Sequence, residues 1–119
     1  MRSEDPSPLT VDERQLLESL LAHDFPGVHE LRVQSRELLA RKGCTCGCGT
    51  IDLIPIGDDL PRSVATSPVP FEGIVLDSSG DAVGGLLLFL TDGLLASLEV
   101  YAYDKPLLLP TIDALRWDR

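Results

Sequence analysis

The residues of this chain best suited to chemistry are three cysteines that stand within five positions: Cys44, Cys46 and Cys48. Thiolates are good ligands for zinc and copper(I), and the glycines around them allow the tight backbone turns that bring several sulfurs to one ion. Because three sulfurs do not complete a tetrahedral site, a fourth ligand has to come from elsewhere. The candidates are a second chain and three side chains of this one: His23, His29 and Asp52. The cluster therefore predicts a zinc or copper site.

Two other interpretations of the cysteine cluster stay open. The cysteines are small and apolar enough to be buried in a tight helix-to-strand passage, or one of them acts as a redox or nucleophilic thiol. The nucleophilic role is opposed by the helix expected to end at Gly43, because the negative end of a helix dipole disfavours a thiolate. An odd number of closely spaced cysteines is not a disulfide framework, so we expect a reducing, cytoplasmic location.

The chain is acidic, with 10 basic and 19 acidic residues in 119 and a formal net charge of −9. This balance excludes nucleic acid and anionic membrane surfaces as partners, since both are bound by clustered cations. No apolar stretch approaches the roughly 20 residues that span a bilayer. The acidity is uneven: residues 1–43 hold 6 basic and 8 acidic residues, a net charge of −2, whereas residues 44–119 hold 4 and 11, a net charge of −7.

A second candidate site lies on the last predicted strand. Glu99, Tyr101 and Tyr103 follow one another at a spacing of two, which places them in a row on one strand face. Tyrosine offers a large contact area with a polar tip, so the row suits recognition of a protein partner. The structural alternative is that tyrosines simply fit a half-exposed pleated surface.

Two helices are expected to position the first part of the chain. Thr10 and Glu13 match a capping box, and the leucines between Leu16 and Leu21 share one helical face behind it. After a break, Asp24 is expected to cap a second helix that runs as far as Lys42. The two helices should form a hairpin.

From Thr50 onward the hydrophobic period changes to two, which predicts four strands at residues 50–55, 71–77, 83–90 and 94–103. The unbroken apolar run at 86–90 indicates a strand covered on both faces, and Asp92-Gly93 is typical of a tight hairpin turn. Residues 57–70 are rich in proline, serine and aspartate and predict a long exposed loop, while residues 111–117 predict one closing helical turn.

These elements predict an α+β fold in which an N-terminal helical hairpin packs on one face of a four-stranded antiparallel sheet. Residues 1–9 are expected to be a flexible lead-in, and residues 10–119 to form a single domain. The apolar face of the last strand, which holds Leu94, Ala96 and Leu98, should meet the helices. A bare apolar patch that includes Leu95 on the opposite face would instead form a homodimer interface.

Three blocks of the sequence stand in a fixed order: Asp24–Gly27 with Glu30, Leu31 and Gln34; Cys44–Cys48 with Ile51; and Leu88–Gly93 with Leu98–Tyr101. Together they resemble a family of small uncharacterised bacterial proteins of actinobacterial type, over roughly residues 10–110. The family has no established activity. The resemblance therefore implies the limits of the domain and carries over no catalytic residue.

Two functions follow from the sequence. The first is a small acidic cytoplasmic protein of binding or regulatory type, similar in role to an immunity protein. A basic protein partner would be held by the acidic second half of the chain and by Glu99, Tyr101 and Tyr103. The second is a metal-binding protein centred on the three cysteines. An enzyme ranks third, because no nucleophile, base and orienting group come together in a recognisable motif.

The metal hypothesis predicts that untagged protein carries at least one equivalent of zinc or copper. Because metal binding contributes to folding free energy, removal of the ion by a chelator should lower the melting temperature. Elemental analysis combined with a thiol titration separates ligated, buried and reactive cysteines. Less than one equivalent of metal and an unchanged melting temperature would contradict the hypothesis.

Overall fold

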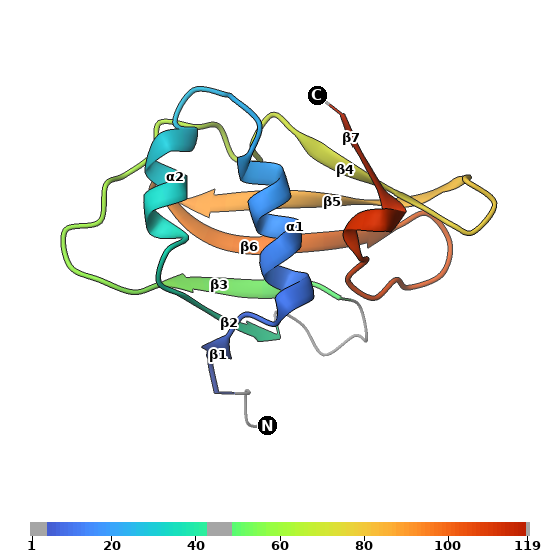
Figure 1. The fold of residues 1–119 in the computed structure, drawn as a ribbon, viewed down its shortest axis with the longest axis horizontal. Helices are drawn as coiled ribbons and strands as arrows, with labels where there is room; N and C mark the ends of the chain where they lie inside the picture. Colours follow the sequence, from blue (N-terminus) through green and yellow to red (C-terminus); the bar gives the residue numbers. More distant parts are fainter. Residues whose placement is uncertain (1–4, 43–48, 119) are drawn as a thin grey trace.

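Seven antiparallel strands and two short helices make up residues 5–42 and 49–118, the part of the chain that the computed structural model describes (Figure 1). The strands lie in the order β1-β2-β3-β6-β5-β4-β7. Their bounds are β1 Ser7–Pro8, β2 Leu38–Lys42, β3 Ile51–Pro55, β4 Glu72–Leu76, β5 Ala82–Thr91, β6 Leu94–Ala102 and β7 Leu115–Asp118. The helices are α1 (Val11–Leu21) and α2 (Val28–Gln34), and one 3-10 turn, η1 (Ile112–Ala114), precedes β7.

The expected α+β fold, with a helical hairpin on four strands, is wrong, because the molecule is mostly a seven-stranded sheet. The four strands expected from the sequence coincide with β3 to β6. Three strands were missed: β1 within the expected lead-in, β2 within the expected second helix, and β7 within the expected closing turn. The hairpin turn at Asp92-Gly93 is confirmed, since both residues have positive φ angles, 53° and 78°, between the paired strands β5 and β6.

Residues 38–42 form a strand where the sequence analysis expects a helix. The helix α2 ends at Gln34, and the Ser35 hydroxyl donates a hydrogen bond to the carbonyl of Arg32 at 2.8 Å. Beyond it, the buried Leu38 and Ala40 alternate with half-buried neighbours, and β2 pairs with β3 along its whole length. A short leucine-rich segment fits both the helical period of about 3.6 residues and the strand period of two. Pairing with β3 decides in favour of the strand.

The two helices begin with different N-terminal caps. At α1 the capping box is confirmed: the Glu13 amide donates to Thr10 Oγ1 at 3.1 Å, and the Thr10 amide donates to Glu13 Oε1 at 2.9 Å. At α2 the expected cap at Asp24 is wrong, because the N-cap is Gly27. Gly27 has a φ of 90°, and a Cβ there would lie 2.4 Å from Ser63 Oγ, so this position requires glycine.

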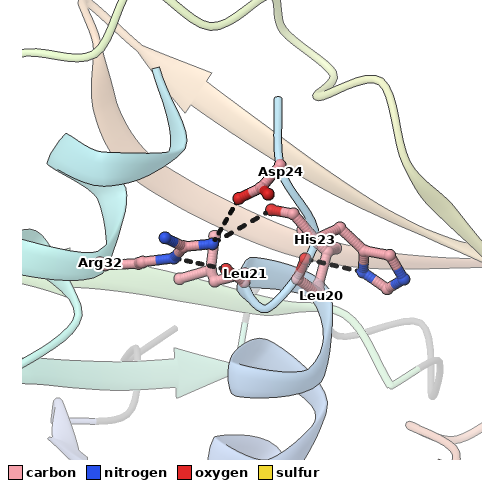
Figure 2. A network of polar contacts seen from close by, with 5 residues as sticks. All are labelled: Leu20, Leu21, His23, Asp24 and Arg32. Atoms are coloured by element: carbon pink, nitrogen blue, oxygen red, sulfur yellow. Dashed lines mark hydrogen bonds and ion pairs between the residues drawn. The ribbon is translucent and has the colours of Figure 1, made fainter. Parts of the chain in front are cut away.

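Arg32 joins the two helices (Figure 2). Its guanidinium donates to the carbonyls of Leu21 at 2.7 Å and His23 at 3.4 Å, which would otherwise lack partners beyond the end of α1. It also contacts the Asp24 carboxylate at 3.3 Å. Because that carboxylate is 97% exposed, water screens the ion pair, and the carbonyl contacts contribute more to the stability of the corner.

The hydrophobic core lies between the helices and one face of the sheet. Both helices lie in front of the strands in Figure 1, and α1 runs across them. Its leucines are almost fully buried against β5 and β6. The fully buried members are Leu16, Leu17, Leu20, Leu31, Leu86, Leu88, Leu95 and Leu98.

The strand β6 contains a bulge, and the expected assignment of its residues to the two sheet faces is wrong before this bulge. Phe89 pairs with Ser97, but Leu90 pairs with Leu95, so Ala96 is an extra residue in β6. Leu95 therefore turns to the core side, where it is 2% exposed. An exposed apolar patch that includes Leu95 is therefore wrong, while homodimer formation itself stays a prediction.

A single buried side chain ties the segment between β3 and β4 to the rest of the molecule. The Gln34 side chain is fully buried, and its amide nitrogen donates to the carbonyls of Pro61 at 2.7 Å and Gly93 at 2.8 Å. Its oxygen accepts from the Leu95 amide at 2.8 Å. Ser63 adds a second link, since its hydroxyl donates to the Gly27 carbonyl at 2.7 Å. Residues 57–70 hold no helix or strand and are bound to the fold at these points.

Replacing Gln34 with leucine should lower the free energy of unfolding by about 3–5 kcal/mol, because one buried and two partly buried backbone groups lose their partner. Urea unfolding measures the change. The matched control is Gln15→Leu, an identical change on the exposed side of α1, which should alter stability by less than about 0.5 kcal/mol. Equal effects of the two changes would contradict the role assigned to Gln34.

Candidate functional site

The face of the sheet opposite the helices carries apolar and acidic side chains together. Strand register places the two sets of side chains, because residues directly paired across antiparallel strands point to the same face. We call this surface the open face, since neither helix covers it (Figure 1). Its members are Leu39, Arg41, Asp52, Ile54, Glu72, Ile74, Gly85, Leu87, Phe89, Ser97, Glu99, Tyr101, Arg116 and Asp118.

The apolar members of the open face are half-buried. Leu87 and Phe89 of β5 alternate with the fully buried Leu86 and Leu88, which face the helices. The expectation that this apolar run is covered on both faces is therefore not met in the described residues. Leu39, Ile54 and Ile74 extend the same partly exposed apolar surface across the sheet. Partly exposed apolar side chains therefore extend over the open face from β2 to β4.

Tyr101 lies flat across the strand next to its own. It pairs with Gly85 of β5, and a Cβ at Gly85 would lie 2.3 Å from the Tyr101 ring, so only glycine leaves room for the ring. The ring thereby crosses β5, and its hydroxyl donates to Glu72 Oε2 on β4 at 2.9 Å. This bond fixes the orientation of Tyr101 on the open face.

The Tyr101 hydroxyl holds its proton unusually firmly. Partial burial is the largest cause, and the hydrogen bond to Glu72, the negative charge of Glu72 and the neighbouring Tyr103 hydroxyl add to it; together they raise the pKa of Tyr101 from 10.0 to about 12. Each cause disfavours the phenolate. The hydroxyl is therefore a donor at any physiological pH.

Two carboxylates flank Leu87 on the open face. Glu99 pairs directly with Leu87 across β6 and β5, and the pairing of Gly73 with Leu86 brings Glu72 to the other side of Leu87. Neighbouring strands are separated by roughly 4.8 Å, so the backbones that carry the two carboxylates lie about 10 Å apart. Glu99 accepts a hydrogen bond from the Ser97 hydroxyl at 3.0 Å, and Glu72 accepts the one from Tyr101. Neither bond neutralises the charge.

A third acidic residue of the open face is paired with a cation. Asp52 of β3 contacts Arg41 of β2 at 3.5 Å, and both side chains are 36% exposed. This ion pair balances the β2–β3 side of the face. The other two carboxylates, Glu99 and Glu72, lie over β6 and β4, and Arg116 of β7 lies on the same face beside Glu72 in the strand register.

The structure separates the three residues that sequence analysis grouped as a partner site. Glu99 and Tyr101 lie on the open face, whereas Tyr103 follows the end of β6, is 59% exposed and lines a hollow beyond the sheet. The rings of Tyr101 and Tyr103 remain neighbours, with centroids 6.0 Å apart. Glu72 was not among the predicted site residues, and the alternation of apolar and polar residues in β4 is the signal that places it on a sheet face.

The predicted metal ligands Cys44, Cys46 and Cys48 lie outside the described residues, so the metal hypothesis stays a prediction. The segment that holds them joins two paired strands, since Lys42 pairs with Ile51, and the helix expected before it is absent. Within residues 5–42 and 49–118, no group of three or more histidine, cysteine or acidic side chains lies close enough to hold a metal ion.

The two histidines have separate positions. His23 stacks on Phe71 with centroids 4.5 Å apart and lies edge-on to Trp117, and its Nδ1 is 3.1 Å from the Leu20 carbonyl oxygen. His29 is exposed on α2. The structure thus assigns His23 to packing at the end of α1.

No protein-family model, curated protein or solved structure matches the chain. In the part of the chain that the structure describes, neither helix has the length and apolar character needed to cross a membrane.

The contact between Tyr101 and Glu72 predicts that the Tyr101 hydroxyl loses its proton at a higher pH than an ordinary tyrosine. In a Tyr103→Phe background, where Tyr101 is the remaining tyrosine, tyrosinate absorbance should rise with a midpoint above 10 and below the value of about 12 that includes the contribution of Tyr103. Because the folded pKa lies above the unfolded value of 10.0, the contribution of Tyr101 to stability is complete below pH 10 and is lost as the pH rises through about 12. Circular dichroism checks that the chain stays folded during the titration.

Adding Glu72→Gln to that background should move the midpoint down toward 10, since the negative charge beside the hydroxyl is gone. Glu99→Gln is the control, because Glu99 lies on the same face without contributing to the shift. A midpoint at the ordinary tyrosine value before Glu72 is changed would show that the hydroxyl does not make the described contact.

Proposed function

We propose that this protein is a small binding protein of the bacterial cytoplasm that holds a basic protein partner on its open face. The observation that carries the proposal is the pair of carboxylates, Glu72 and Glu99, on either side of the half-buried Leu87. Apolar side chains at the centre with charges around them are typical of protein–protein interfaces.

The geometry of the open face indicates which side chains a partner would present and how far apart they would lie. Two lysine or arginine side chains about 10 Å apart would meet the two carboxylates, because that is the separation across two strand spacings. An apolar side chain between them would cover Leu87 and Phe89. Tyr101 is already held in place by Glu72, so little side-chain entropy is lost when a partner covers it.

The overall charge supports the same partner. The chain has a formal net charge of −9, of which −7 lies in residues 44–119, where five of the seven strands and most of the open face are found. Such a field attracts basic proteins and speeds their association at low salt. It also repels acidic competitors, which adds to selectivity.

The proposal is tested with partners captured from a lysate of the native host and then purified for direct affinity measurement. A Glu72→Gln/Glu99→Gln variant should bind a captured basic protein about tenfold more weakly than the wild type, since two interfacial charges are lost. Raising the salt concentration should weaken the wild type more than the variant. Isothermal titration calorimetry gives both quantities.

The matched control is Asp12→Asn/Glu18→Gln, which removes two exposed carboxylates from α1 on the other side of the sheet. It should leave the affinity unchanged. The proposal fails if both double variants bind equally well. It also fails if sedimentation shows that the open face pairs two copies of this chain, because the occupant is then a homodimer partner.

A further inference from the structure

An apolar hollow lies where β4, β5 and β6 leave the sheet, against the chain that leads to β7 (right-hand side of Figure 1). Its volume is about 570 Å³, which is within the range of small-molecule sites. The apolar residues that line it include Val75, Val83, Leu107, Leu108, Pro110 and Ala114. None of these residues belongs to the open face, and Leu107 also packs against the main core cluster.

The floor and the rim of the hollow differ in exposure. Val75 at the floor is 5% exposed and is buried apart from the main hydrophobic cluster. Leu108 at the rim is 76% exposed, and Tyr103 is 59% exposed. A molecule seated in the hollow would cover these two large side chains, which removes apolar surface from water.

The charges around the hollow are mainly negative. Asp77, Asp104 and Lys105 are the charged residues that line it, so two carboxylates face one ammonium group. Asp77 is positioned by its own turn, since its Oδ1 accepts from the amides of Ser79 and Asp81. The negative charge of the whole chain adds to this local excess. The charge favours a cation and opposes a carboxylic acid such as a fatty acid.

We infer that this hollow binds a small apolar molecule that carries an ammonium group. The hydrocarbon part would lie against Val75, Val83 and Leu107, and the cation would lie at the rim near Asp104 and the Tyr103 ring. This site is separate from the open face, so it does not depend on the protein partner proposed above.

Octylamine, octanol and octanoate test the inference, because they share one hydrocarbon chain and differ in charge. Octylamine should give saturable NMR shifts at the methyl groups of Val75, Val83 and Leu107, with a dissociation constant of about 1 mM or lower. Octanol should bind more weakly and octanoate weakest. Equal binding of the three compounds would overturn the charge assignment, and no binding of octylamine would overturn the site.

Two pairs of variants locate the site. Ala82→Trp places a bulky side chain at the lining and should abolish octylamine shifts, whereas the control Ala22→Trp lies on the exposed end of α1 and should not. Asp104→Lys should reverse the preference between octylamine and octanoate, while Asp58→Lys, on the segment between β3 and β4, should leave it unchanged. Octylamine binding that survives both lining changes would overturn the inference.

Glu72→Gln/Glu99→Gln separates this inference from the proposed function. This variant should bind octylamine as the wild type does, because neither residue lines the hollow. Loss of octylamine binding in this variant would overturn the assignment to the hollow without bearing on the basic partner.

Discussion

The buried amide of Gln34 is the constraint on which the arrangement of the molecule depends. It joins the end of α2 to the segment between β3 and β4 and to the β5–β6 turn, which are far apart in the sequence. A buried amide of this kind is stabilising only when all its partners are present, so the three segments hold their positions together. Ser63 supports the same junction through Gly27 and Gly93.

This junction holds α2 on one side of the sheet, and Arg32 ties the end of α1 to α2 on the same side. The opposite side is left as the open face. The apolar run of β5 then faces two environments, with Leu86 and Leu88 in the core and Leu87 and Phe89 half-covered. The bulge at Ala96 sends Leu95 into the core while leaving Glu99 and Tyr101 on the open face. Stability and the candidate binding surface thus come from alternate residues of the same strands.

Local signals in the sequence predicted the parts of the fold that depend on neighbouring residues. The capping box at Thr10 and the turn at Asp92-Gly93 need only residues within a few positions. The strand β2 could not be predicted this way, because its leucines fit a helix equally well and only pairing with β3 decides the matter. Gln34 looks like an ordinary surface residue of a helix, and its partners lie 27 to 61 positions away.

The same distinction applies to the candidate site. The alternation of β6 was enough to place Glu99 and Tyr101 on one face. The contact of Tyr101 with Glu72 depends on a glycine in the strand between them, which is a property of three strands in register. The two outermost strands also limit how the sheet can be used. β1 has two residues and includes Pro8, which has no amide hydrogen to offer, and β7 has four residues with Arg116 and Asp118 on its open side. Neither is a good template for an added strand, so fibre-like growth is discouraged even though an apolar face is left uncovered.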